Sequence, residues 1–432
     1  MLVGSADSFR LSPAQETLWE YLKYFHPGDP GAAAMNLVGT AMLPGTVDIA
    51  SLRAAVDEVG ERHEPLHTRF ARAGMEPRLT LGCPRVPLIV STAGDHLRAD
   101  HAERLAAVVD AAVRRRFDLL AGPLWAAYLV RRQRDSVLVV SLFPIVGDER
   151  SIWVLIRELG RSYRARAGLG PAPAAVPTTY RATVTSRAST PALDDDVLRQ
   201  WCQRLLPLPE ALPQADPPVA EPPSLVRRRF SLPPPTRVGL TRTARLIGTT
   251  RFVLLLGAYA ALLALRAGTD RVVMGTPTPG RHGGALGSLV GRFADILYVE
   301  IRVSTSMSFH DLSCHVQERL TEAARVAPPF TRLAALVHPA FLDDRPWPFV
   351  HLIDAWFSAE TVAGSNTSSW QPPRHVRRHA PGARVNGSGG VLAYDPRHFT
   401  SAQVDTLADG YVRLVCGVVA DPHRPIGGHR AQ

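Results

Sequence analysis

One stretch of the chain, Val139–Trp153, constrains the fold more than any other. Its apolar run begins just upstream, at Val137, and is typical of a strand that lies inside a protein. A short turn then closes on Gly147 and Asp148, and the residues after it place apolar side chains at helical spacing, with charged residues between them. A strand that delivers polar groups at its end and continues into a helix is a common frame for a reactive site. The stretch is therefore a candidate position for a reactive site. Around it, the pattern predicts a hairpin of Trp125–Arg131 and Ser136–Leu142 and a helix over Ser151–Arg166.

Length and hydropathy bound the class of protein. The 432 residues exceed one ordinary core and predict two domains or lobes of about 200 residues each. The N-terminal residues show no basic segment followed by an apolar run, so we expect no secretory signal. The longest apolar run, Phe252–Leu265, is shorter than the roughly 20 residues that a membrane span needs. We therefore expect a buried helix there, no membrane partner and a cytoplasmic location.

The charge of +10 is a weak guide to function. Lys23 is the only lysine among 49 basic residues, an arginine bias typical of a GC-rich coding genome. The arginines are spread along the chain without the interleaved aromatic residues that a nucleic-acid surface needs, so we expect no nucleic-acid partner. The four cysteines stand singly and show no metal-binding spacing. We expect neither a metal site nor a disulfide framework.

A set of short motifs follows in order along the whole chain. They are Ser12–Trp19, Arg62–Phe70, Phe117–Leu119 with Gly122–Leu124, Gly275–Arg281 and Leu289–Leu297. In this order and at this spacing, and together with the turn after Val139, they resemble the condensation domains of non-ribosomal peptide synthetases. The resemblance covers nearly the whole chain and is specific for fold more than for activity.

The resemblance implies an α/β fold of two chloramphenicol-acetyltransferase-like lobes, which form a V-shaped pseudo-dimer with a central tunnel. We assign residues 1–175 to the N-terminal lobe, 176–235 to a Pro-rich inter-lobe connection and 236–432 to the C-terminal lobe. Within the last of these, residues 365–390 are rich in Gly, Ser, Pro and Arg, and we interpret them as a long exposed loop.

The family signature is degenerate in this chain. In the family the strand ends in His-His, three spacer residues and Asp-Gly, and the second His is catalytic. Laid on that pattern, Phe143 and Pro144 occupy the two His positions, Asp148 the Asp and Glu149 the Gly. A general base needs a proton acceptor within hydrogen-bond reach, and a proline side chain has none. The resemblance thus implies the fold without its catalytic imidazole.

Two carboxylates in this turn are candidates for a replacement role. In the family the Asp is structural and bonds the Arg of the Gly-Arg loop, so we predict a bidentate pair between Asp148 and Arg281 that joins the lobes. A base role for Asp148 is the alternative. For Glu149 we rank exposure to solvent or a salt contact with Arg150 first, blocking of the tunnel second and general-base work third.

Other polar residues are candidates for lining the tunnel: Arg292, Asp295, His282 and His351. Each is individually more typical of a structural role than of a reactive one. We interpret His67, which stands where the second family motif has Arg, as a structural hydrogen-bonding residue rather than a catalyst.

Two functions follow from the resemblance. In the first, a discrete condensation-type protein of non-ribosomal peptide or hybrid polyketide assembly joins a carrier-bound acyl or aminoacyl group to an amine or alcohol by positioning. In the second, the chain is a non-catalytic platform that recruits a carrier protein or a tailoring enzyme. A coenzyme-A-dependent acyltransferase is a weaker third reading. The expected partner is a peptidyl or acyl carrier protein, whose phosphopantetheine arm tethers the substrate, and we expect no bound cofactor.

Overall fold

The structure, a computed structural model, describes residues 8–22, 36–73, 76–92, 98–132, 134–188, 194–205, 226–278, 280–281, 284–326, 355–359, 381–394, 396 and 398–431. These residues form two compact α/β units. The first unit holds the described residues of Met1–Ala192 and Pro279–Asp295. The second unit holds those of Leu193–Thr278, Ile296–Ala363 and Pro372–Gln432.

The first unit contains a four-stranded sheet in the order β2-β7-β6-β5 and a three-stranded sheet in the order β1-β4-β3. Its elements are β1 (Ser8–Arg10), α1 (Pro13–Leu22), β2 (Leu37–Pro44), α3 (Ile49–Arg62), η1 (Glu64–His67), β3 (Thr68–Ala73), β4 (Glu76–Leu81), β5 (Leu88–Thr92), α4 (Arg98–Arg114), β6 (Trp125–Arg131), β7 (Asp135–Leu142), α5 (Glu149–Arg166), α6 (Tyr180–Ala188) and η2 (Gly284–Ser288).

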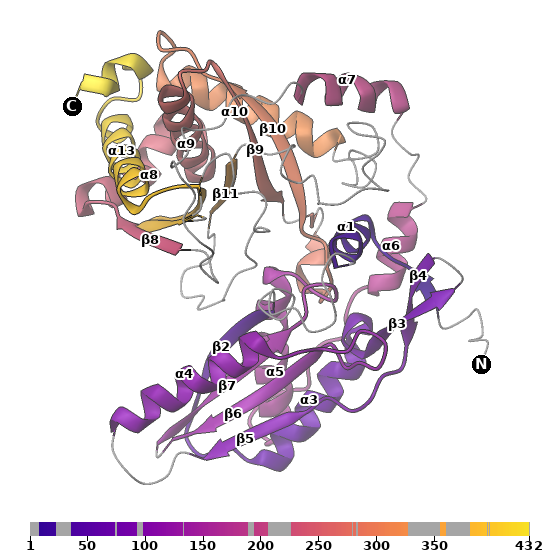
Figure 1. Cartoon of the computed structure of the whole chain (residues 1–432). Helices are drawn as coiled ribbons and strands as arrows, with labels where there is room; N and C mark the ends of the chain where they lie inside the picture. The colour runs from indigo at the N-terminus through magenta and orange to yellow at the C-terminus, as the bar shows by residue number, and fades with distance from the viewer. Residues whose placement is uncertain are drawn as a thin grey trace. The chain divides into compact units, whose positions relative to one another are not determined.

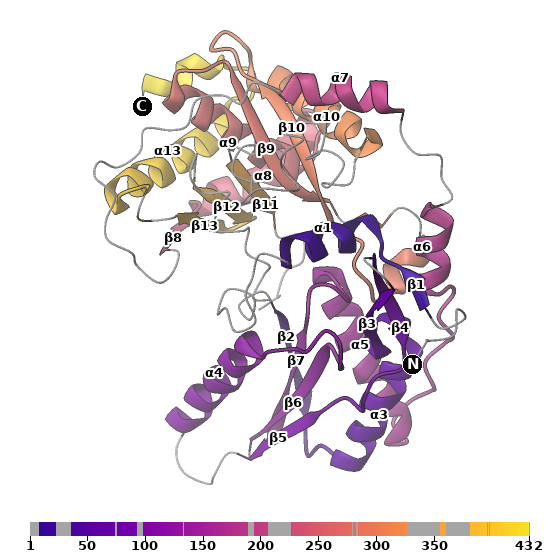
Figure 2. The ribbon, with the colours of Figure 1, turned by 45° about the vertical axis from the view of Figure 1, so that its right-hand side comes forward.

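Helices cover both faces of the four-stranded sheet. Helix α4 lies on one face, and α3 and α5 pack together on the other, as Figures 1 and 2 show from two directions. Strand β7 is therefore buried on both sides from Ser136 to Leu142. This explains why its sequence reads as a nearly continuous apolar run rather than as alternating apolar and polar residues. The C-terminal end of β7, Leu142, lies directly before the candidate site.

The second unit is built on a six-stranded sheet in the order β10-β9-β11-β12-β13-β8. Its elements are α7 (Asp195–Leu205), β8 (Val226–Ser231), α8 (Pro234–Leu246), α9 (Arg251–Ala267), β9 (Arg271–Thr278), β10 (Asp295–Arg302), α10 (Phe309–Val326), β11 (Ala355–Ala359), β12 (Gly382–Asn386), β13 (Gly389–Tyr394), α13 (Ser401–Ala420) and η5 (Ile426–Ala431).

Helix α9 forms the centre of the second unit. It is apolar on nearly all sides and buried from Val253 to Ala264. The hydroxyl of Thr250 caps its N-terminus, and Gly268 ends it in the left-handed conformation that favours glycine. In the part of the chain that the structure describes, no helix alone is long and apolar enough to cross a membrane. Helices α8 and α9 reach that length only as a pair bent by 103°.

Several predictions from hydrophobic periodicity are confirmed. The apolar run at 252–265 is a buried helix, and the two strands before the signature turn form an antiparallel hairpin, β6–β7. Helix α5, expected from residue 151 onward, begins two residues earlier, at Glu149. The difference arises because Asp148 serves as the N-cap, a role that apolar periodicity does not reveal.

Two segments interpreted as connections contain regular structure. Within 176–235, the described residues form α6, α7 and β8, and β8 is a full member of the second unit's sheet. Within 365–390, residues 382–386 and 389–390 belong to strands β12 and β13, which pair through a tight turn at Gly387 and Ser388. High Pro, Gly and Arg content suggested loops here. Pairing with neighbouring strands outweighs that local composition.

Candidate functional site

The signature turn, residues 143–148, connects β7 to α5 and is buried throughout. Its apolar residues Ile145 and Val146 have no exposed surface, and Phe143 retains 6%. Gly147 is required by close packing, because a Cβ atom at this position would lie 2.4 Å from Cδ2 of Leu142. The turn is thus part of the core of the first unit rather than an open loop.

Asp148 caps helix α5. Its Oδ1 accepts from the backbone N–H of Ser151 at 2.9 Å, and the Ser151 hydroxyl accepts from the backbone N–H of Asp148 at 3.1 Å. This reciprocal arrangement is a capping box, which satisfies two N–H groups that the first turn of a helix leaves without partners. We did not predict this role for Asp148. The signal in the sequence is the spacing Asp-x-x-Ser directly before a helical apolar pattern.

Asp148 also pairs with Arg281, as the resemblance led us to expect, but through one carboxylate oxygen and not as the bidentate pair that we predicted. Nη2 of Arg281 lies 2.8 Å from Oδ1 of Asp148, and the two side chains are only 6% and 4% exposed. The second carboxylate oxygen accepts from the backbone N–H groups of Phe293 and Ala294 at 3.1 and 3.2 Å. We expected a pair between the lobes. Both residues instead belong to the first unit, because the chain after β9 packs there from Pro279 to Asp295.

Arg281 fastens this returning segment to the turn. Besides Asp148, its guanidinium donates to the carbonyl oxygens of Leu286, Leu289 and Gly291. It also lies over the ring of Phe293, with Cζ 4.4 Å from the ring centroid, a cation–π contact. One planar cation therefore bonds a carboxylate and three carbonyl groups, which a lysine could not do with the same geometry.

Pro144 stands at the position of the family's catalytic His, and the backbone carbonyl groups around it are held by hydrogen bonds from other segments. Pro144 is buried, and its carbonyl oxygen accepts from Nη1 of Arg292 at 3.2 Å. Nε of the same arginine donates to the carbonyl of Ala14 at 2.9 Å, and Gln15 donates to the next carbonyl of the turn, that of Ile145, at 2.8 Å. Burial lowers the pKa of Arg292, although the charges of Asp295 and Asp148 oppose this effect. In these contacts the side chains of Arg292 and Gln15 donate hydrogen bonds to carbonyl groups of the turn.

Tyr180 is a residue of this site that sequence reasoning missed. Its hydroxyl lies 3.1 Å from both the Ser12 hydroxyl and the carbonyl oxygen of Arg292, and its ring meets Phe293 edge to face at 5.2 Å. A Cβ atom on Gly291 would clash with the Tyr180 ring at 2.3 Å. No motif in our sequence analysis includes Tyr180, and its partners Ser12 and Arg292 are more than 100 residues away along the chain.

The other predicted site residues are dispersed. Glu149 is exposed and is the first residue of α5, where the helix dipole stabilises a negative charge. Asp295 is half-buried at the start of β10. His282 and His351 lie outside the described residues. Nδ1 of His67 lies 3.0 Å from the carbonyl of Gly60, a position that fits the structural reading.

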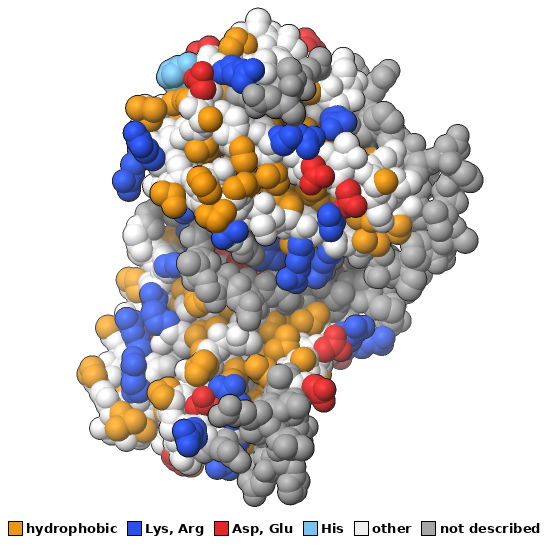
Figure 3. Space-filling view, turned by 90° about the vertical axis from the view of Figure 1, so that its left-hand side faces the viewer, with side chains coloured by type: hydrophobic (Ala, Val, Ile, Leu, Met, Phe, Trp, Pro, Cys, Tyr) orange, Lys and Arg blue, Asp and Glu red, His pale blue; other side chains and the backbone are white. Residues whose placement is uncertain are grey.

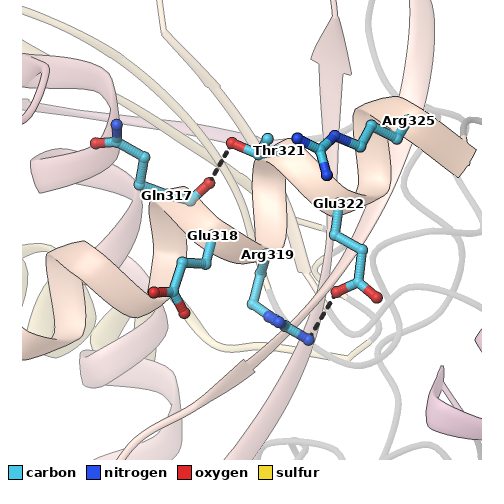
Figure 4. Close-up of a pocket in the computed structure, with 6 residues that line it drawn as sticks. All are labelled: Gln317, Glu318, Arg319, Thr321, Glu322 and Arg325. Atoms are coloured by element: carbon cyan, nitrogen blue, oxygen red, sulfur yellow. Dashed lines mark hydrogen bonds and ion pairs between the residues drawn. The ribbon is translucent and has the colours of Figure 1, made fainter.

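A pocket of about 570 Å³ lies elsewhere, along α10 in the second unit (Figure 4). It is lined by Gln317, Glu318, Arg319, Thr321, Glu322 and Arg325. Arg319 and Glu322 pair with each other at 2.7 Å, and no predicted site residue reaches the pocket. Among the described residues, no group of three or more His, Cys, Asp or Glu side chains is placed to hold a metal ion.

A buried strand–turn–helix capped by an Asp–Arg pair, in a chain of two α/β units, defines a condensation-type protein with a degenerate signature. The chain belongs to the condensation domain family, whose match extends over residues 5–360. It is 30% identical over 441 residues to phosphinothricin tripeptide synthetase PhsC of Streptomyces viridochromogenes, and 30% identical over 450 residues to a dimodular nonribosomal peptide synthase of Bacillus subtilis. These matches cover 95% and 96% of this chain but only 39% and 18% of the two relatives.

Solved structures show the same fold. SgcC5 of Streptomyces globisporus, crystallised with (R)-(-)-1-(2-naphthyl)-1,2-ethanediol and sucrose, superposes with a TM-score of 0.75 at 23% identity; the match covers 96% of this chain and 100% of SgcC5. The X-domain from teicoplanin biosynthesis, in complex with OxyB, gives 0.73 at 21% identity, with coverage of 99% and 96%. The chain therefore has the acetyltransferase-like α/β fold of condensation domains.

Proposed function

We propose that this chain acts in non-ribosomal peptide assembly as a non-catalytic platform that recruits a carrier protein or a tailoring enzyme. One observation carries the proposal. The position of the catalytic His is a buried proline whose carbonyl oxygen already accepts from Arg292. A residue without a proton acceptor, held in this way, cannot take a proton from an attacking amine.

Asp148 and Ser151, the buried polar residues of the turn and of the first turn of α5, offer no substitute. Asp148 accepts from Ser151, from Arg281 and from two backbone N–H groups, so both its oxygens are committed to holding the turn together. The Ser151 hydroxyl is engaged by the same groups and by Gly291. General acid–base work needs a group that can exchange its partner for the substrate, and these groups are fixed by the fold.

Relatives indicate what such a platform would hold. The X-domain with the same fold was solved in complex with OxyB, so a condensation fold can present a surface to another protein. Relatives in peptide synthetases work beside carrier proteins, whose phosphopantetheine arm tethers the intermediate. We infer the same kinds of partner for this chain, in the cytoplasm.

A second candidate function is transfer by positioning alone. SgcC5, with the same fold over nearly the whole of both chains, was crystallised with an aryl diol, a ligand that offers hydroxyl groups. An amine or alcohol held in line with a carrier-bound thioester gains rate from orientation without a base; the gain reaches about 7 kcal/mol or more in well-oriented systems. Transfer by positioning does not require a general base, which is the group that the turn lacks.

One experiment separates the two candidates. A carrier protein loaded with an aminoacyl group is mixed with candidate amine or alcohol acceptors and this protein, and the carrier is followed by mass spectrometry. The platform proposal expects binding of the loaded carrier or of a tailoring enzyme in calorimetry, without condensed product. Product that forms only when the protein is present would overturn the platform proposal and establish transfer.

A gain-of-function variant tests the scaffold directly. The double substitution Phe143→His and Pro144→His restores the family's two imidazoles in the turn, and Glu149→Gly alone serves as the matched control. The platform proposal expects no product from the native chain or the control. Product from the double variant alone would show that the missing base is the only defect.

A further inference from the structure

Helix α8 in the second unit presents large apolar side chains to solvent. On its outer side, Val238 is 80% exposed and Leu246 is 71% exposed, the two highest values among the large apolar residues that the structure describes. Single exposed apolar residues are ordinary on a protein surface, but two on one short helix require an explanation. The inner side of the helix packs in the core through four buried residues: Thr236, Leu240, Thr243 and Ala244.

Helical spacing brings the two exposed apolar residues together with two arginines. Val238, Arg242 and Arg245 stand at i, i+4 and i+7, and Leu246 follows at i+8. With 3.6 residues per turn, these four positions lie within roughly 100° of the helix circumference, so they share one face. All four side chains are exposed. We call Val238, Arg242, Arg245 and Leu246 the α8 face.

Helix α13 packs closely against α8 next to this face. A Cβ atom on Gly239 would clash with Cγ1 of Val419, and the hydroxyl of Thr236 lies 3.2 Å from Sγ of Cys416. The α8 face is therefore carried by a helix that the fold holds in place. Figure 3 shows the side of the molecule at which Figure 1 places α8 and α13, and apolar and basic side chains are interspersed on it.

The α8 face lies in a stretch of sequence that has no acidic residue. From Pro222 to Thr269 the chain carries eight arginines and neither Asp nor Glu. Arg242 and Arg245 form no ion pair with the residues that the structure describes, whereas Arg228 of the same stretch pairs with α13. The charge of the face is therefore positive and favours an acidic partner.

The carboxylates of α13 do not neutralise this charge. Asp405 pairs with an arginine of β8, and Asp421, the C-cap of α13, accepts a hydrogen bond from the backbone two residues later at 3.0 Å. Asp409 stands two turns before Cys416, the residue that contacts the first turn of α8, so about 10 Å of helix separates the two. Among the described residues, no ion pair joins α13 to the α8 face.

A lipid surface and a protein can both supply acidic groups to such a face. Helices that lie in a membrane interface insert aromatic and leucine side chains between the lipids. Helix α8 contains no aromatic residue, and its inner side is held in the core. From Val238 to Leu246 the α8 face is about 12 Å long, which matches two turns of another helix. A helical protein segment therefore fits this face better than a lipid surface does.

We propose that the α8 face docks an acidic amphipathic helix of a partner protein. Apolar side chains of that helix would cover Val238 and Leu246, and carboxylates beside them would pair with Arg242 and Arg245. Arginine suits this role because its apolar stem packs while its guanidinium pairs, and it is enriched in protein interfaces. The biological role of the α8 face rests on the proposed platform function, since it names the surface that would recruit the partner; the binding itself does not.

The test is fluorescence anisotropy of the whole chain with a labelled helical peptide of about 18 residues, which has leucines along one side and glutamates on both flanks. A second peptide carries glutamine in place of every glutamate and is otherwise identical. We expect the native chain to bind the acidic peptide at least about tenfold more tightly than the glutamine peptide. Equal affinity for the two peptides would overturn the proposal.

Substitutions locate the binding on the chain. Arg242→Gln combined with Arg245→Gln should weaken binding of the acidic peptide about fivefold, and Leu246→Ser about tenfold. We expect the corresponding controls to bind within about twofold of the native chain, and circular dichroism melting curves confirm that every variant is folded. The controls change exposed positions of the first unit: Arg157→Gln combined with Arg164→Gln on α5, and Leu169→Ser.

Two further results would overturn the α8 face: native affinity in its variants, or an equal loss in the variants and their controls, which would indicate diffuse attraction to a basic protein. Co-sedimentation with vesicles of equal parts phosphatidylcholine and phosphatidylserine tests the lipid alternative. Vesicle binding that Leu246→Ser abolishes, without peptide binding, would replace the partner protein by a membrane surface. None of these measurements uses a carrier protein or turnover, so failure of the α8 face and failure of the proposed function can be told apart.

Discussion

Arginines are used in opposite ways in the two units. In the first unit, Arg281 is buried and bonds a carboxylate, a hydroxyl and three carbonyl groups. In the second unit, Arg227 and Arg229 of β8 are exposed, and neither makes an ion pair with a residue that the structure describes. A charge is costly to bury unless it is paired, so the first arrangement must find its partners within the fold. Water screens the exposed charges, so the second needs no such partners.

This difference separates a buried arrangement of arginine from an exposed one. The Asp148 network, which we define as Asp148, Ser151, Arg281 and the backbone of 291–294, sits at the position where the family carries its chemistry. Both oxygens of Asp148 are engaged within the fold, whereas Nε of Arg281 is buried without a hydrogen bond to the described residues. Arg227 and Arg229 have no counterpart among the motifs, and their side chains are exposed.

The largest expected effect comes from breaking the Asp148 network. Asp148→Asn removes the negative charge beside Arg281 and leaves that guanidinium buried without its counter-ion. Removal of one partner of a buried ion pair destabilises a protein by about 3 to 5 kcal/mol. Urea unfolding followed by fluorescence would measure the change. If the loss is below about 1 kcal/mol, the network is not the structural element that we describe.

The control for this variant is an exposed ion pair. Asp110 accepts from Arg114 at 2.9 Å on α4, but the two side chains are 60% and 73% exposed. Asp110→Asn should change the free energy of unfolding by no more than about 0.5 kcal/mol, because solvent screens such pairs. The same chemical substitution thus tests burial alone.

His63 extends the comparison to a buried polar group that lacks a partner. Its Nε2 is buried without a hydrogen bond, and burial lowers the pKa of His63 from 6.5 to about 4. The unfolded chain then binds more protons than the folded chain between these values. Stability is therefore complete above about pH 6.5 and falls by about 3 kcal/mol as the pH drops to 4. Melting temperatures from pH 4.5 to 7.5 would measure the slope.

A variant isolates the contribution of this histidine from that of the carboxylates. His63→Gln should flatten the dependence of stability on pH in that window, whatever its own cost. A native slope retained in this variant would contradict a neutral, buried His63.

Gly280 tests whether the returning segment must approach the turn closely. It has a φ of +59°, and a Cβ atom there would lie 1.9 Å from the carbonyl oxygen of Phe293. Gly280→Ala combines an unfavourable backbone conformation with a clash against backbone atoms, so we expect a loss of about 2 kcal/mol. Gly284→Ala, on the same segment with nothing within 4 Å of its Cβ position, should be nearly neutral. Thermal unfolding of the two variants gives the comparison.

The sequence predicted the parts of this molecule that local pattern determines. Periodicity located the buried helix at 252–265 and the hairpin β6–β7, and the ordered motifs indicated the family. The contact of Asp148 with Arg281 followed from the resemblance. The sequence could not show that Arg281 packs in the first unit. This placement depends on the segment Pro279–Asp295, which leaves the second unit after β9 and packs in the first.

Other features depend on pairing between distant strands. Strand β8 lies in a stretch of prolines and arginines that suggests a connection, and it becomes a strand only through its partner β13, some 160 residues later. That register also brings Arg229 and Arg384, which are far apart in sequence, into one row across the sheet. Tyr180 was missed for a similar reason, because its partners are Ser12 and the backbone of Arg292.

The smallest expected effect comes from Arg228, the one arginine of the β8 triplet that has an acidic partner. It pairs with Asp405, and the two side chains are 52% and 45% exposed. A double-mutant cycle of Arg228→Gln and Asp405→Asn, followed by urea unfolding, should give a coupling energy of about 0.2 to 1 kcal/mol. A coupling energy near that of a buried pair, about 3 kcal/mol or more, would mean that exposure does not separate the two uses of arginine.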